Sequence, residues 1–87
     1  MSSTYVMAFE STHAAMAAEA YLEGEAAHAA MIPTPRAISA GCGMSMRFER
    51  EGDAAACELA RGCEDARGLA ALYKEAPDKT YQLIEKL

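Results

Sequence analysis

The 87-residue chain carries 13 acidic and 8 basic side chains, which gives a formal net charge of −5. This length has room for one hydrophobic core, so we treat residues 1–87 as a single domain, with a core over 4–74 and a tail over 75–87. Phosphate binding needs a concentrated basic surface, which this charge balance argues against. No stretch approaches the roughly 20 apolar residues that cross a bilayer. The first residues lack the basic region of a secretory signal. We therefore expect a cytoplasmic protein with no nucleic-acid or membrane partner.

The first half of the chain predicts three strands and one helix. Residues 5–9 are apolar on both faces, which favours a central strand. Ser11 and Thr12 suit the N-cap of a helix over 12–22, which Gly24 ends. Within that helix, core spacing singles out Ala15, Ala18 and Leu22. Two further strands are predicted over residues 28–32 and 43–48.

The second half predicts a helix, a strand and a terminal helix. Asp53 is expected to cap a helix over 54–61, and Gly62 stops it. Residues 68–74 are read as a fourth strand, because the sheet would otherwise be incomplete. Pro77 then offers the start of a short terminal helix, with three apolar residues on one side, namely Tyr81, Ile84 and Leu87.

The order β-α-β-β-α-β predicts an α+β fold with a ferredoxin-like, split β-α-β antiparallel sheet. Two helices would cover one face, and the short C-terminal helix would follow. In this arrangement residues 5–9 pair antiparallel with residues 44–48. The loop between the second and third strands then lies close to the first helical turn at Ser11 and His13.

That loop holds the most informative residue of the chain, Cys42. Two prolines fix their φ angles ahead of it, and the thiol lies between two glycines. Arg36 and Arg47 flank it, and residues 26–48 contain no carboxylate. A cysteine near cations and near a helix N-terminus is a candidate for a reactive thiol of low pKa.

The segment resembles the selenium/sulfur carrier protein-like family of small bacterial domains over roughly residues 4–74. The string from Pro35 to Gly43 is fairly specific, because several residue types recur in fixed register. The matching positions are Tyr5 to His13, Glu19, Ile32, Pro33, Pro35, Arg36, Ile38, Ser39, Cys42, Gly43, Arg47 and Phe48. The resemblance implies a bacterial, cytoplasmic protein that carries sulfur or selenium. The alanine-rich first helix, the extra cysteines and the tail beyond Glu75 depart from the family pattern.

Each candidate site residue also has a plainer interpretation. Arg36 either pairs with a thiolate or an anionic substrate, or is a solvated loop arginine. Arg47 faces away from the helices, where it serves a partner or keeps that face soluble. His13 is a proton donor or an exposed residue of the first turn. Ser39 bonds the thiolate or forms the turn.

The remaining cysteines do not indicate a metal site. Cys57 is most simply a small core residue, and Cys63 is either buried or a resolving thiol. Cys42, Cys57 and Cys63, with the two histidines, lack the paired ligand spacing of structural zinc. We therefore predict free thiols and no metal or cofactor.

Three functions fit these observations. In the first, Cys42 accepts sulfur or selenium from a donor protein as a persulfide or perselenide and passes it to an acceptor protein. The absence of a Ser/His/Asp or paired-carboxylate pattern favours a carrier or binding protein over an enzyme with turnover. In the second, the loop of a binding or regulatory module grips an anionic small molecule. In the third, a homodimer buries an open sheet face that includes Val6 and Ala8, with Leu72 or Ala70.

Overall fold

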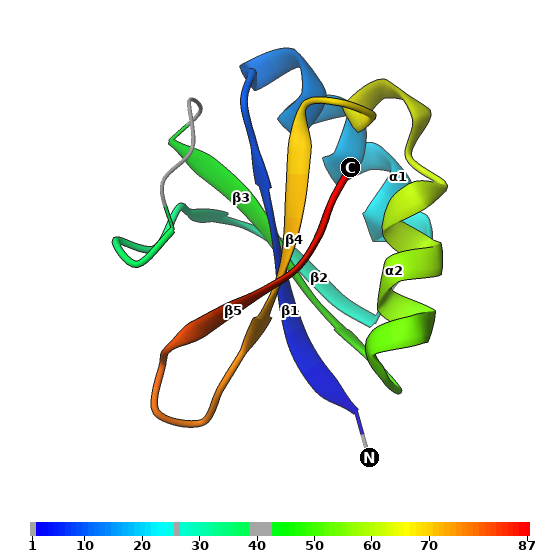
Figure 1. Cartoon of the computed structure of the whole chain (residues 1–87). Helices are drawn as coiled ribbons and strands as arrows, with labels where there is room; N and C mark the ends of the chain where they lie inside the picture. The colour runs from blue at the N-terminus through cyan, green and yellow to red at the C-terminus, as the bar shows by residue number, and fades with distance from the viewer. Residues whose placement is uncertain (1, 26, 39–42) are drawn as a thin grey trace.

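The computed structural model describes residues 2–25, 27–38 and 43–87. Within these residues the chain forms an α+β fold of five strands, two α-helices and one short 3-10 helix (Figure 1). In chain order the elements are β1 (Ser3–Phe9), α1 (Thr12–Glu25), β2 (Ala27–Pro33), β3 (Met44–Arg50), α2 (Asp53–Arg61), the 3-10 helix Glu64–Ala66, β4 (Ala70–Glu75) and β5 (Tyr81–Lys86).

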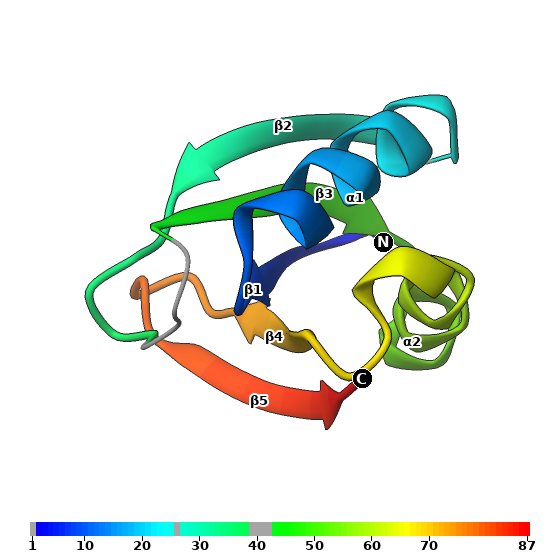
Figure 2. The ribbon, with the colours of Figure 1, turned by 90° about the horizontal axis from the view of Figure 1, so that it is seen from above.

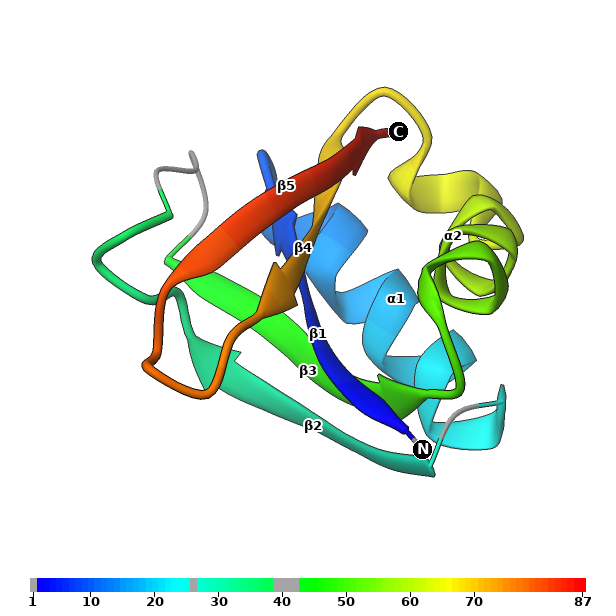
Figure 3. The same ribbon diagram turned by 60° about the horizontal axis from the view of Figure 1, so that its bottom comes forward.

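The sheet is antiparallel throughout, with the strand order β2-β3-β1-β4-β5 (Figure 3). β1 is central, as its two apolar faces predict. It pairs with β3 in a register that sets Tyr5 opposite Phe48 and Ala8 opposite Ser45. The predicted antiparallel pairing of residues 5–9 with 44–48 is therefore confirmed. The predicted strand over 68–74 is also present, as β4.

The prediction of a C-terminal helix is wrong, because the tail forms β5 and adds a fifth strand beyond β4. The strand order thus differs from that of the four-stranded ferredoxin-like sheet that the sequence predicts. Pro77 and Asp78 belong to a hairpin turn in which Lys79 has a φ of 68°. The Asp78 carboxylate accepts bonds from the backbone and side chain of Thr80, at 3.1 and 2.7 Å. A turn that closes on itself in this way returns the chain along β4.

The helix prediction for the tail relied on the i, i+3 spacing of Tyr81, Ile84 and Leu87, and the structure places these residues differently. Tyr81 packs on the helix-free side of the sheet, whereas Ile84 and Leu87 pack against the helix-side core. Side chains alternate between the faces of a strand, so Tyr81 and Ile84, three residues apart, lie on opposite faces. The irregularity in the β4–β5 ladder, between Leu72 and Tyr73, leaves Ile84 without a partner and lets Ile84 and Leu87 share the helix side. The three apolar residues therefore do not share one side, as they would on a helix.

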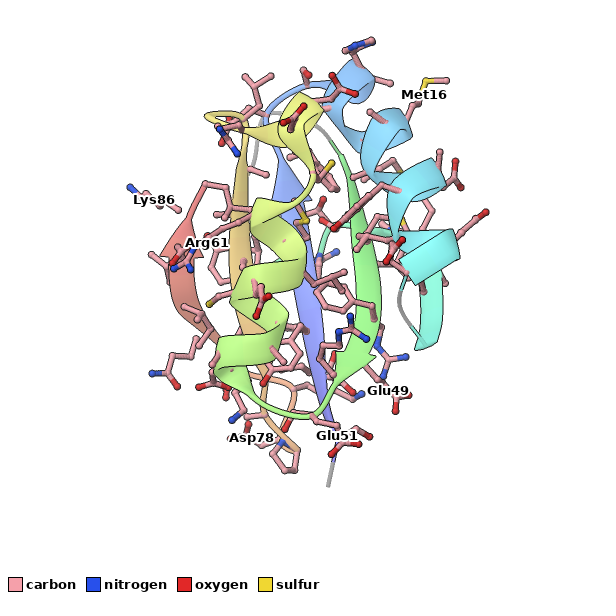
Figure 4. The ribbon with its side chains drawn as sticks, turned by 90° about the vertical axis from the view of Figure 1, so that its right-hand side faces the viewer. Met16, Glu49, Glu51, Arg61, Asp78 and Lys86 are labelled. Carbon is pink, nitrogen blue, oxygen red and sulfur yellow. The ribbon has the colours of Figure 1, made fainter. Side chains whose placement is uncertain are left out.

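Both helices cover one face of the sheet, as predicted (Figure 2). The main core lies beneath them, and Tyr5 and Phe48 stack there with ring centroids 6.0 Å apart. Arg61 extends from α2 to β5, where its guanidinium binds the Glu85 carboxylate (Figure 4). The predicted core positions of α1, namely Ala15, Ala18 and Leu22, are all buried.

The opposite face is not the open surface that the dimer hypothesis requires. Val6 and Ala8 are buried there beneath residues of the same chain, chiefly Ile38. Ala70 and Leu72 belong to the helix-side core instead. The apolar character of these four residues is therefore accounted for by packing within one chain.

The helix ends match the sequence in part. The Ser11 hydroxyl accepts the backbone N–H of Ala14 at 3.1 Å, so the predicted cap is present. α1 continues through Gly24, where a stop was expected. Asp53 does not cap α2, which has no side-chain cap. Its carboxylate instead accepts a hydrogen bond from the Tyr5 hydroxyl at 2.6 Å, and burial together with this bond raises the pKa of Tyr5 to about 12.

Gly62→Ala is expected to destabilise the fold by about 1–3 kcal/mol, the usual range for overpacking. A Cβ at this position would lie 2.3 Å from the Tyr21 hydroxyl oxygen. That hydroxyl donates to the Leu59 carbonyl at 2.9 Å, so moving the ring breaks a bond at the end of α2. Thermal or urea unfolding measures the change.

Gly24→Ala is the matched control. A Cβ at Gly24 meets nothing within 4 Å, and the residue lies inside α1. Alanine there should stabilise by up to about 1 kcal/mol through helix propensity. Equal losses at both glycines would contradict the role given to Tyr21.

Candidate functional site: the loop between β2 and β3

The loop between β2 and β3 is tied together at its base by backbone hydrogen bonds. The Thr34 N–H donates to the Gly43 carbonyl at 2.9 Å, which joins the two ends of the loop. The Ile38 N–H donates to the Pro35 carbonyl at 2.9 Å and closes a turn. Arg36 and Ala37 are the two central residues of that turn. Cys42 and Ser39 lie outside the described residues.

A pair of hydroxyls supports the same base. The Oγ1 of Thr34 lies 2.8 Å from the Oγ of Ser45, which is fully buried in β3. A buried hydroxyl is costly to leave without a partner, so this contact stabilises the start of the loop against the sheet.

The sequence did not predict the contact that Ile38 makes with the sheet. It is only 4% exposed although it belongs to a loop, and it packs on Val6 and Ala8 of β1. Ile32, Tyr73 and Tyr81 pack at the margin of this cluster. The sequence signal that could have indicated this contact is a large β-branched residue, Ile38, in a loop of mostly small and polar residues.

The other predicted site residues of this region are exposed. Arg36 extends from the turn, and Gly43 precedes β3 directly. A Cβ at Gly43 would meet nothing within 4 Å, so close packing does not require glycine there. His13 is exposed in the first turn of α1. The end of β1, from which α1 follows, lies beside the start of β3.

Arg47 lies in a charged cluster on the helix-free face, in β3 opposite Val6 of β1. Its Nη2 is 3.5 Å from the Oε2 of Glu75, whose side chain is only 10% exposed. Tyr81 donates to the other carboxylate oxygen at 3.1 Å, and the Lys79 Nζ lies 3.4 Å from Oε2. Burial raises the pKa of Glu75, but the bonds from Tyr81 and Arg47 outweigh it and hold that pKa below the usual range. Arg47 therefore has a structural partner.

Glu75→Gln should lower stability at pH 7 by about 1.5–3 kcal/mol, the scale of a hydrogen bond to a charged group. Because the folded pKa of Glu75 is lowered, its contribution is present above the unfolded value of about 4.3. It is lost as pH falls through the folded pKa. Urea unfolding at a series of pH values should show that the unfolding free energies of the variant and the wild type become equal in acid. Glu23→Gln, at an exposed glutamate of α1, is the control and should change stability by no more than about 0.5 kcal/mol.

The two cysteines within the described residues are poor nucleophiles. Cys57 and Cys63 are both buried and free. Burial raises the pKa of each thiol, and the Glu85 charge adds to the increase at Cys57. Cys63 lines a hollow of about 190 Å³ with Ala60, Arg61, Arg67 and Leu87. A raised pKa and poor access disfavour Cys63 as a resolving thiol.

Two features are absent from the part of the chain that the structure describes. No three His, Cys, Asp or Glu side chains there gather as a metal site would require. None of the helices there has the length and apolar character to span a membrane.

Comparison of the chain with models of known protein families finds a match. The family model described as "Putative Se/S carrier protein-like" matches residues 4–76. The match spans most of the chain, and the protein belongs to this family. No curated protein and no solved structure matches the chain.

Proposed function

We propose that the protein is a sulfur or selenium carrier and that the thiol of Cys42 is the acceptor. Family membership over residues 4–76, which includes the Cys42-Gly43 string, is the observation that carries this proposal. The raised pKa values of the other two thiols support it, because they leave Cys42 as the best nucleophile. Arg36 and Ser39 would assist the thiolate, and His13 would supply a proton from the first turn of α1.

The transfer is a thiol–disulfide type of displacement. The Cys42 thiolate attacks the outer sulfur or selenium of a donor persulfide or perselenide, and a bond forms between them. The bond from that atom to the donor sulfur breaks, and the donor leaves as a thiolate. The number of electrons is conserved, so no external oxidant is needed. Attack by an acceptor thiolate on the outer atom then repeats the displacement and returns Cys42 to its thiolate.

Loading with a small persulfide tests the proposal. The protein is incubated with glutathione persulfide, and the intact mass and its cysteine-containing peptides are measured. We expect one added sulfur, on Cys42, that dithiothreitol removes and that Cys42→Ser lacks. Addition of sulfur to Cys57 or Cys63 instead would refute the assignment, and no addition to any cysteine would refute the carrier function.

Arg36→Ala should slow the alkylation of Cys42 at neutral pH more than Arg47→Ala does. Arg36 is exposed in the same loop, whereas the Arg47 charge is engaged by Glu75. Four residues of strand separate Gly43 from Arg47, or about 13 Å. Charge effects at that range are largely screened at physiological salt. The rates of iodoacetamide labelling measure this, and equal effects would show that Arg36 does not act on the thiol.

A further inference from the structure

Arg50, the last residue of β3, has a buried nitrogen that no other group of the described chain satisfies. Its side chain is on the helix side of the sheet, because it alternates in step with Met46 and Phe48 of the main core. Within the described residues the Nε atom is buried without a hydrogen-bond partner, and none of the ion pairs there includes Arg50. A buried charged donor without an acceptor is costly and therefore calls for an explanation.

The same arginine lines a hollow of about 380 Å³ between the two α-helices. The Tyr21 hydroxyl, which donates to the Leu59 carbonyl at 2.9 Å, joins α1 to α2 beside this hollow. Figure 4 faces this side of the molecule, with Glu51 at the start of α2. The remaining lining residues are Ala55 and Glu58 of α2. A volume of this size lies in the range of small-molecule sites.

The lining of the hollow combines three kinds of chemistry. Arg50 supplies a guanidinium, whose planar fork of donors matches a carboxylate. Tyr21 and Leu59 supply apolar surface. Glu51 and Glu58 supply two carboxylates, which disfavour a polyanion such as phosphate because like charges repel. A ligand that matches all three has one carboxylate, one ammonium group and an apolar body.

We propose that the hollow between α1 and α2 binds a free α-amino acid with an apolar side chain. The Arg50 guanidinium donates to the ligand carboxylate, which gives the buried Nε an acceptor. Glu58, which is exposed on α2, accepts from the ligand ammonium group, and the ligand side chain packs beside Tyr21 and Leu59. The site is built from β3 and the two helices, so it goes beyond the carrier function and does not depend on it.

Three probes that share one carbon skeleton test which groups of the ligand are recognised. L-Leucine has the carboxylate, the ammonium group and the apolar chain, whereas isocaproate lacks the ammonium group and isopentylamine lacks the carboxylate. Each is titrated into isotope-labelled protein, and the NMR shifts of the Ala55 and Leu59 amides are followed. Leucine should give saturable shifts. The other two probes should bind at least about tenfold more weakly, which corresponds to about 1.4 kcal/mol, and inorganic phosphate should not shift these amides.

Two variants and one control assign the binding to named side chains. Arg50→Met keeps the unbranched stem and removes the guanidinium, so leucine should bind at least about tenfold more weakly. The same change should not lower the melting temperature of the free protein, because the group removed has no partner among the described residues. Glu58→Gln, at an exposed position, should weaken the binding of leucine and leave that of isocaproate unchanged. Arg67→Met is the control, since Arg67 is exposed and lines a different hollow.

Several results would overturn the proposal. Leucine that shifts neither amide would show that the hollow is not an amino-acid site. Equal leucine binding by Arg50→Met and Arg67→Met would remove the guanidinium from recognition. Isocaproate or phosphate that binds as tightly as leucine would refute the ligand class. A large fall in the melting temperature of Arg50→Met would mean that the guanidinium serves the fold and not a ligand.

Discussion

At neutral pH, iodoacetamide is expected to alkylate Cys42 at least about tenfold faster than Cys57 or Cys63, the factor that corresponds to about 1.4 kcal/mol of free energy to expose a buried thiol. Both of the other thiols are buried, and burial raises their pKa values. Reaction of either buried thiol should therefore require local opening of the fold. Labelling followed by peptide mass spectrometry gives the three rates separately.

Denatured protein is the control for this comparison. In concentrated urea all three thiols should react at similar rates, because the environments that distinguish them are lost. A native protein in which Cys63 reacts first would make the hollow beside Arg61 and Arg67 the chemical site, and would remove Cys42 from the mechanism. Equal rates in the native protein would have the same consequence for Cys42.

The sheet could be predicted well because its strands obey simple rules. The alternation of residues 5–9 and 44–48 identified two strands, and the geometry of split β-α-β units set them side by side. Even β4, whose alanine and leucine favour helix, was predicted from the need to complete the sheet. Long-range pairing overrode local propensity there, as it commonly does.

The tail could not be predicted from spacing alone. Residues three apart, such as Tyr81 and Ile84, share one side of a helix but lie on opposite faces of a strand, so the same spacing is compatible with either element. The hairpin turn at Asp78 decides between them, and its hydrogen bonds to Thr80 become evident only in three dimensions. Asp53 was misjudged for a similar reason, because its partner Tyr5 is 48 positions away in sequence.

The position of the loop between β2 and β3 was predictable, whereas the contacts that hold it on the sheet were not. Arg36 and Gly43 were identified from local composition, and both lie at the loop as expected. The contact of Ile38 with Val6 and Ala8 depends on which face of the sheet the loop covers. The buried Glu75 that engages Arg47 comes from a different strand, and no local pattern connects the two residues.

Phe48→Ala is expected to cost about 3–5 kcal/mol of stability, the usual range for truncating a buried aromatic residue. Phe48 is fully buried in β3, stacks on Tyr5 and contacts the core beneath both helices. A domain of this size has a total stability of roughly 4–13 kcal/mol at typical values per residue. The variant should therefore melt at least about 12 °C lower, at 4–8 °C per kcal/mol.

Leu83→Ala is the control for this loss, because Leu83 is 45% exposed and should change stability by no more than about 0.5 kcal/mol. Phe48 also belongs to the β1–β3 register that brings the start of β3 beside the end of β1. Below its melting temperature the variant should still accept sulfur on Cys42, since Phe48 lies on the helix side of the sheet, away from the loop. A folded Phe48→Ala protein that cannot be loaded would mean that the core, and not the loop alone, determines the reactivity of the thiol.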